Sequence, residues 1–270
     1  MTEMSTKPNP APAFQSHPDY RIELLACPKR LRATFDGATV FDTLDGVLLR
    51  ETKHQPVYYV PRADVDMSLM ERTDHGTHCP FKGDAGYFSL RHGNRVAENA
   101  VWTYETPFDE CLGVKDHLAF YWDRLDHWYE EDDEVFVHAR DPHVRIDVLA
   151  SSRPVRVEAG GETVAETTRA LFLFETDHPV RYYVPRQDVR EDVLRPSETH
   201  TGCPYKGTAS YHHLEVGERT IENAVWFYPE AYDEVRRIAG YLCFYPEKVD
   251  RIVVGGRDAS SGSRLTRDLL

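Results

Sequence analysis

Apolar and polar residues alternate over much of the chain, and short turn sequences separate the alternating stretches. Residues 30–43 alternate about a turn at Asp36 and Gly37, and residues 153–167 alternate about a glycine pair. Alternation on both sides of a two-residue turn is typical of a β-hairpin. The pattern therefore predicts a hairpin near the start of each half of the chain.

Further strands are predicted where β-branched and aromatic residues dominate, at residues 56–65, 94–104, 180–189 and 219–228. One segment in each half has helical spacing instead. Residues 231–242 place the apolar side chains of Val235, Ile238, Ala239 and Leu242 on one helix face. Residues 107–121 are the corresponding segment of the first half. The predicted fold class is mainly β and antiparallel, with one short helix in each half.

The chain contains one sequence written twice. Cys79 and Cys203 are 203 − 79 = 124 positions apart, and the tryptophans Trp102 and Trp226 have the same offset. Residues 54–104 and 178–228, compared without a gap, share 24 identities in 51 positions. A period of this length indicates a duplicated domain rather than a solenoid repeat.

This offset divides the chain into a first repeat domain, residues 17–140, and a second, residues 141–258. Residues 1–16 are rich in proline and small polar residues, which predicts a disordered lead-in. Residues 259–270 are predicted to form a flexible tail. The acidic run at 129–134 is interpreted as a solvated loop or helix end rather than a metal or partner site.

Composition narrows the function classes. The net charge of −13, with no basic face, disfavours nucleic-acid binding. No run of about 18 apolar residues and no signal pattern is present, so we expect a cytoplasmic protein without membrane contact. Five cysteines without CxxC spacing argue against a disulfide framework and a four-thiolate zinc site, and we expect no cofactor. The oligomeric state is left open.

The segment THCPFKGDAGY at 77–87 recurs as TGCPYKGTASY at 201–211. Proline fixes φ and glycine permits positive φ, so the CPxKG segment is predicted to be a turn. One interpretation is purely structural, with the cysteine filling space beneath the turn and the lysine solvating it. The other makes this turn part of a binding site.

The second interpretation groups the polar and aromatic residues that recur. Strand alternation puts Glu98 on the same face as Trp102, so a carboxylate would lie beside an aromatic wall. Such a group could bind a small polar or anionic molecule or a peptide, or it could be one structural ion pair packed on tryptophan. The candidate ligand-binding residues are Arg62, Cys79, Lys82, Tyr87, Glu98, Asn99 and Trp102 in the first half, and Arg186, Cys203, Lys206, Tyr211, Glu222, Asn223 and Trp226 in the second.

A catalytic thiol would need a base beside it. His75 and His78 precede Cys79, but at the offset of 124 they face Thr199 and Gly202. This drift argues against a fixed Cys–His pair and against a metal site in either half. The common phosphate-loop, dinucleotide, zinc-protease and α/β-hydrolase motifs are missing from the sequence.

The segments YYVPRQDV, HTGCPYKGTASY, IENAVWFYPE and IAGYLCFYPEKVD resemble the bacterial domain-of-unknown-function family 427. The two copies cover nearly all of residues 17–258, and the second copy is the closer match. The resemblance implies a β-tent, or Mss4-like, architecture in which two small antiparallel sheets meet at an angle. Because each copy has one recurring thiol, the four-cysteine zinc of many β-tent proteins is expected to be absent.

Three hypotheses about function remain. The favoured one is a binding module with a cleft at the CPxKG turn of each half. The second is an enzyme for group transfer that uses the recurring Cys, Lys and Glu, and the family is also labelled nucleotidyltransferase-like. No metal-binding acid pair beside a phosphate loop supports that label here. The third is a structural scaffold.

Overall fold

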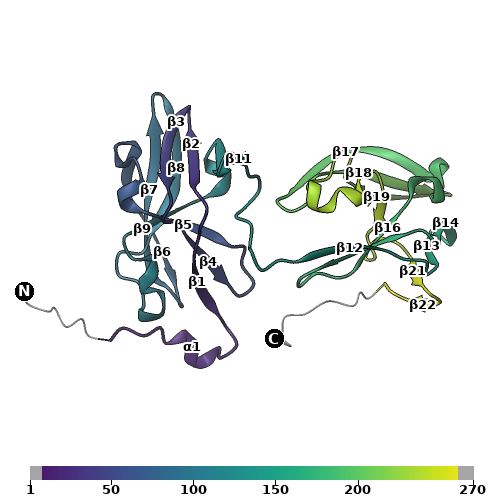
Figure 1. The fold of residues 1–270 in the computed structure, drawn as a ribbon, viewed down its shortest axis with the longest axis horizontal. Coiled ribbons are helices and arrows are strands. Elements are labelled where there is room, and N and C mark those ends of the chain that lie inside the picture. Colours follow the sequence, from purple (N-terminus) through teal and green to yellow (C-terminus); the bar gives the residue numbers. More distant parts are fainter. Residues whose placement is uncertain (1–7, 261–270) are drawn as a thin grey trace, which may run out of the picture. The chain divides into compact units, whose positions relative to one another are not determined.

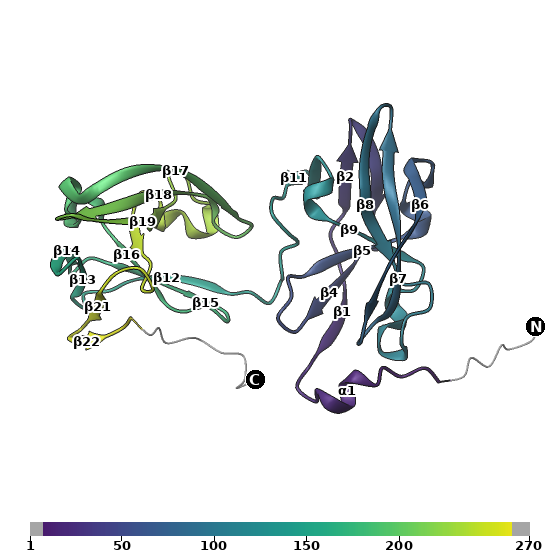
Figure 2. The same ribbon diagram turned by 180° about the vertical axis from the view of Figure 1, so that it is seen from behind.

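The structure is a computed structural model of the 270-residue chain, and it describes residues 8–260. The chain forms two compact units that meet in sequence at residues 141 and 142. Each unit contains two antiparallel sheets and a few short helical turns, which confirms the mainly β class (Figures 1 and 2). Within residues 8–260, every helix is too short to cross a membrane.

The first half has a seven-stranded sheet in the order β1-β4-β5-β9-β8-β7-β6 and a four-stranded sheet in the order β11-β10-β2-β3. The strands are β1 Ile22–Ala26, β2 Leu31–Phe35, β3 Ala38–Thr43, β4 Val47–Glu51, β5 Val57–Pro61, β6 Met70–Cys79, β7 Gly83–His92, β8 Arg95–Thr103, β9 His117–Phe120, β10 His127–Glu130 and β11 Asp133–Glu134.

The second half repeats this plan with sheets β12-β15-β16-β20-β19-β18-β17 and β14-β13-β21-β22. Its strands are β12 Ile146–Ala150, β13 Val155–Ala159, β14 Glu162–Thr167, β15 Leu171–Glu175, β16 Arg181–Val184, β17 Leu194–Cys203, β18 Gly207–Val216, β19 Arg219–Phe227, β20 Leu242–Phe244, β21 Arg251–Val254 and β22 Arg257–Asp258. In Figure 1, β17, β18 and β19 lie across from β13, β14, β21 and β22.

The helical turns are short. They are the α-helix α1 Ala13–Ser16 and the 3-10 helices η1 Arg62–Asp64, η2 Met67–Leu69, η3 Asp109–Val114, η4 Trp122–Arg124, η5 Arg186–Asp188, η6 Glu191–Val193 and η7 Asp233–Ile238.

Each half buries one main core between its two sheets. In the first half, Phe35 and Phe41 of the small sheet join Leu90 and Leu118 of the large one. In the second, Phe172, Leu214 and Phe244 are buried with valines of β13, β14 and β21. The alternating pattern thus gives each large sheet one face for this core and leaves its opposite face for a second cluster of different composition.

The predicted hairpins are confirmed. Strands β2 and β3 pair through Phe35 and Ala38, and the turn residues Asp36 and Gly37 have φ of 51° and 77°. Positive φ at both central positions is the conformation that Asp-Gly and Gly-Gly turns favour in two-residue hairpins. Strands β13 and β14 repeat this arrangement.

The predicted helix at residues 231–242 is only partly correct. The 3-10 helix η7 ends at Ile238, and Leu242 already belongs to β20. Inside η7, Val235 has non-helical φ of −125°, and Gly240 follows with φ of 74°. Apolar spacing of three and four residues therefore serves two short turns and a strand here, because the same side chains reach the core in either conformation.

Of the segment predicted to be a disordered lead-in, the structure describes residues 8–16, while residues 1–7 and 261–270 lie outside the described residues. The amide of Asn9 donates to Asp109 at 2.8 Å, and Ala11 is buried. Phe14 of α1 meets the ring of Phe81 edge-on, with 5.0 Å between centroids. The segment is polar in composition, but the packing of its one aromatic residue, Phe14, on Phe81 provides apolar contact area.

Gly83 and Gly207, which open β7 and β18, have φ of 98° and 101°. A Cβ at Gly207 would lie 3.2 Å from the carbonyl oxygen of Glu230, and one at Gly83 would lie 3.4 Å from that of Thr106. We predict that Gly207→Ala lowers the free energy of unfolding by about 1–3 kcal/mol in a urea titration, because an L-residue is strained there.

Gly76→Ala is the control for this prediction. Gly76 has no positive φ, and a Cβ there would meet its nearest neighbour at an ordinary 3.5 Å. We expect the change to be within about 1 kcal/mol of the wild type. Equal losses for Gly76→Ala and Gly207→Ala would contradict the backbone explanation.

Candidate functional site

The CPxKG segment is a turn in both halves. Residues 80–82 join β6 to β7, and Cys79 pairs with Gly83 across the end of the hairpin. The backbone N–H of Lys82 donates to the carbonyl oxygen of Cys79 at 3.3 Å, and Lys206 and Cys203 repeat this bond at 3.3 Å. The turn thus places each lysine close to the cysteine that ends the preceding strand.

These lysines point inward, to a buried carboxylate. Lys82 forms an ion pair with Glu51, and the Nζ of Lys206 is 2.6 Å from both carboxylate oxygens of Glu175. The side chains of Lys206 and Glu175 are only 11% and 8% exposed. The ion pair therefore joins the turn to the last residue of β4 in the first half and to the last residue of β15 in the second.

Sequence reasoning missed this carboxylate. Glu98 was the expected acid, whereas the acid that meets Lys82 is Glu51. A signal was present, because Glu51 and Glu175 are also separated by 175 − 51 = 124 residues. In the first half the hydroxyl of Tyr20 donates to Glu51 at 2.7 Å, and burial, then the Glu51 carboxylate, raises the pKa of Tyr20.

Beside the ion pair, the outer face of each large sheet carries tyrosines and a tryptophan. The Nε1–H of Trp102 donates to the hydroxyl of Tyr59 at 3.1 Å, and Trp226 donates to Tyr183 at 3.2 Å. Both tyrosines are almost fully buried. A hydrogen bond to a buried tyrosine therefore fixes the orientation of each indole.

A second aromatic ring packs against each indole. Tyr121 lies 4.8 Å from Trp102, and Tyr245 lies 4.4 Å from Trp226, measured between ring centroids. We call each of these two pairs an aromatic platform. Tyr121 is 43% exposed, Trp102 and Tyr245 are half-buried, and Trp226 is buried, so the first platform reaches the surface through both rings and the second through Tyr245.

Hydroxyl groups line one edge of each platform. The hydroxyls of Thr201 and Tyr211 are 2.7 Å apart, and that of Tyr211 is 3.5 Å from that of Tyr245. In the first half Thr77 and Tyr87 are 2.9 Å apart. Burial, followed by the hydrogen bond with Tyr87, raises the pKa of Tyr121 to about 12, so the Tyr121 hydroxyl stays protonated at neutral pH.

Glu98 and Asn99 precede Trp102 in β8 and lie at a β-bulge. Val101 pairs with Phe88 and Ala97 pairs with Leu90, so four steps of β8 oppose two of β7. Asn99 has φ of 50°, and its side-chain oxygen accepts from the hydroxyl of Thr73 at 2.7 Å. Asn223 repeats this with φ of 49° and Ser197 at 2.6 Å.

The carboxylate of Glu98 is exposed over a shallow hollow of about 300 Å³ that contains no platform residue. Glu222 is likewise exposed. The structure therefore brings Cys79, Lys82, Tyr87 and Trp102 to one part of the sheet and leaves Glu98 and Asn99 at another. The hollow is lined by Glu71, Arg72, Thr73, His75, Ser89, Arg91, Val96, Glu98 and Asn99.

The recurring arginines also have partners of their own. Arg62 donates to Glu105 at 2.7 Å, and Arg186 donates to Glu191 at 2.6 Å. Asp64, two residues after Arg62, accepts from the hydroxyl of Thr43 at 2.6 Å. These arginines lie in surface ion pairs and contribute no free cation to the platforms.

The five thiols differ in surroundings. Cys79 and Cys203 are half-buried at the turn, whereas Cys111 and Cys243 are buried and burial raises their pKa to about 11 and about 12. Burial also raises the pKa of Cys27. Residues 8–260 contain no cluster of three His, Cys, Asp or Glu side chains that could hold a metal ion.

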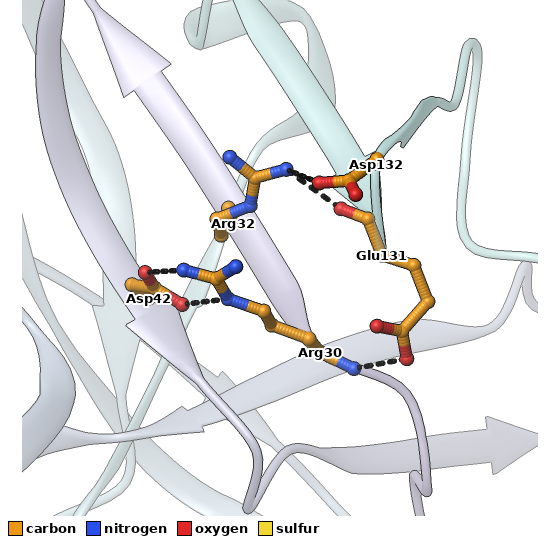
Figure 3. Close-up of polar contacts among 5 residues, drawn as sticks. All are labelled: Arg30, Arg32, Asp42, Glu131 and Asp132. Atoms are coloured by element: carbon orange, nitrogen blue, oxygen red, sulfur yellow. Dashed lines mark hydrogen bonds and ion pairs between the residues drawn. The ribbon is translucent and has the colours of Figure 1, made fainter.

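The acidic run at residues 129–134 forms part of a hairpin whose acids face arginines (Figure 3). The carboxylate of Glu131 accepts from the backbone of Arg30 at 3.0 Å, and Asp132 accepts from Arg32 at 2.9 Å. Arg30 also donates to Asp42 at 2.7 Å. The solvated loop or helix end expected for this run is instead the β10–β11 hairpin, in which Glu130 is buried.

A family model described as a domain of unknown function (DUF427) matches residues 23–131 and 147–255. The two matched segments correspond to the two halves and include the platform residues Trp102, Tyr121, Trp226 and Tyr245. No curated protein matches the chain.

The buried ion pair yields a stability prediction. Lys206→Met leaves the Glu175 carboxylate buried without its partner, which we expect to cost about 3–5 kcal/mol of unfolding free energy. A urea titration followed through the Trp226 indole signal measures this in the second half. The double variant Lys206→Met, Glu175→Leu removes both charges and should recover most of the loss. Equal losses in both variants would contradict a coupled pair.

Alkylation separates the five thiols. We predict that iodoacetamide at pH 8 modifies Cys79 and Cys203 much faster than Cys111 and Cys243 in the folded chain. The latter two are buried, and their pKa values of about 11 and about 12 leave little thiolate. Peptide mass spectrometry over time gives the five rates, with the urea-unfolded chain as control. Uniform rates in the folded chain would contradict the prediction.

Proposed function

The chain belongs to the DUF427 family, with one copy of the family domain in each half, and we propose that each half is a small-ligand-binding module. The ligand is a small polar molecule or a peptide end that rests on the aromatic platform. One observation carries the proposal: Trp102 with Tyr121 and Trp226 with Tyr245 form pairs of the same orientation, and each pair is partly exposed, through both rings in the first half and through Tyr245 in the second.

The construction of the platform supports binding. An aromatic pair kept only for the core would gain most by full burial, since each ring contributes through the area removed from water. Tyr121 instead keeps 43% of its surface in solvent while Trp102 is held by the buried hydroxyl of Tyr59. The exposed rings offer an apolar contact, and the hydroxyl edge offers donors and acceptors that set orientation.

The proposed site differs from the expected cleft at the CPxKG turn. The ammonium groups of Lys82 and Lys206 are occupied by Glu51 and Glu175, so they serve as positioning groups and not as anion ligands. Tyr87 and Trp102 stay in the proposed site, with Tyr211 and Trp226 in the second half. Glu98, Asn99 and Arg62 lie outside it, as do their counterparts.

Ligand screening by NMR tests the proposal. Uncharged probes such as indole, uracil, glucose and N-acetylglycinamide are titrated into the ¹⁵N-labelled full chain. The indole N–H signals of Trp102 and Trp226 report binding. We expect at least one probe to give a saturable shift, and Tyr121→Ala to weaken it at Trp102 by roughly fivefold, since an aromatic contact contributes about 1 kcal/mol.

Tyr245→Ala should act in the same way on the Trp226 signal. Phe136→Ala is the matched control, because Phe136 is a 49% exposed aromatic residue of the first half outside the platform. If no probe shifts either indole, or if the platform variants bind as well as the control, the binding proposal is wrong and the scaffold hypothesis gains.

A further inference from the structure

The second half carries a cation on its outer face that the first half lacks. Arg181 opens β16 at the position where β5 has Val57, since 181 − 124 = 57. The guanidinium carbon lies 5.2 Å from the ring centroid of Trp226 and 6.0 Å from that of Tyr245. Arg181 therefore stacks directly on the aromatic platform.

Among residues 8–260, no carboxylate forms an ion pair with the guanidinium of Arg181. Its Nη1 is buried and has no hydrogen-bond partner among the described residues. On the neighbouring strand β15, the carboxylate of Glu175 directs both oxygens to Lys206 at 2.6 Å. A buried N–H of a charged group is costly to leave unpaired, so an orphan of this kind calls for an explanation such as a bound anion.

The charge composition makes this orphan more informative. The chain has 45 acidic residues against 32 lysines and arginines, so an acidic partner for an arginine is abundant. Arg50, which is also mostly buried, pairs with both Glu23 and Asp141. Within the described part of the chain, Arg181 has no such partner and is surrounded by the rings and hydroxyls of the proposed ligand site.

We propose that the second platform binds an oxyanion, the carboxylate or phosphate group of a small ligand, through Arg181. This inference rests on the proposed binding function. The planar guanidinium fork matches the two oxygens of either group. The hydroxyl edge of Tyr211 and Tyr245 supplies further donors. The first half has Val57 at this position, so its platform takes an uncharged ligand, and the two halves differ in the ligand charge they accept.

The test titrates sodium phosphate and sodium acetate separately into the ¹⁵N-labelled full chain, with chloride keeping the ionic strength constant. Trp226 is the one tryptophan of residues 142–270, so its assigned indole signal reports the second platform. We expect a saturable shift with at least one anion, and the tighter of the two identifies the phosphate or the carboxylate as the natural group.

Arg181→Val installs the residue of the first half and should weaken anion binding by about tenfold or more, because charge-assisted hydrogen bonds are roughly twice as strong as neutral ones. Arg181→Lys keeps the charge without the fork and should fall between. Unchanged indole signals of Trp102, Trp122 and Trp128 in these variants show that the first half is intact. Val57→Arg should make the Trp102 signal respond to the same anion.

Two results would overturn the inference. One is a wild-type Trp226 signal that shows no saturable shift with either anion. The other is equal anion affinity in the wild type and Arg181→Val, which would mean adventitious ion binding only. Uncharged probes that still shift Trp226 in those cases would leave the binding module standing, whereas loss of all probe binding at both platforms removes the proposed function itself.

Discussion

A buried ammonium–carboxylate pair is the constraint on which the outer face of each large sheet depends. Lys82 and Glu51 are 31 residues apart in sequence, and their contact fixes the β6–β7 turn against the end of β4. Replacing such a pair by apolar residues is often neutral or stabilising, because desolvation offsets most of the Coulomb attraction. What the pair supplies is geometry. It sets where Cys79 and Tyr87 lie relative to the indole of Trp102.

Comparing the two halves shows which residues this geometry requires and which positions can vary. The ion pair, the tryptophan with its buried tyrosine partner and the threonine–tyrosine hydroxyl pair occur in both halves. Two neighbouring positions differ. Tyr20, which donates to Glu51, corresponds to Val144, and Val57 corresponds to Arg181. The shared residues build a rigid aromatic surface, and the differing ones change the polar groups around it.

The sequence predicted the β class, the hairpins and the duplication, because alternation and turn residues act over short distances. It placed Lys82, Tyr87 and Trp102 in one group, but it chose Glu98 as the acid. The bulge at Asn99, whose φ is 50°, separates Glu98 from Trp102 along β8, and a positive φ at a non-glycine residue leaves no pattern in hydropathy. Arg181 could not be predicted for a different reason. It occurs in one copy only, because the first half has Val57 at that position, so it is not among the recurring residues.

The same ion pair weighs against the catalytic alternative. A nucleophilic or basic lysine must be free to approach a substrate, and the Nζ of Lys206 is held 2.6 Å from both oxygens of the buried Glu175 carboxylate. Covalent chemistry at Cys203 would also require a base beside the thiol, and the histidines near it in sequence are directed elsewhere: His200 bonds to Ser210 at 3.2 Å. The groups that remain available at the platforms are aromatic rings and hydroxyls, joined in the second half by the Arg181 guanidinium and by the Lys248 ammonium, which lies 5.3 Å from the ring centroid of Tyr245. Such groups can hold a ligand by contact, hydrogen bonding and charge, and this is the ground on which we propose binding rather than group transfer for this face.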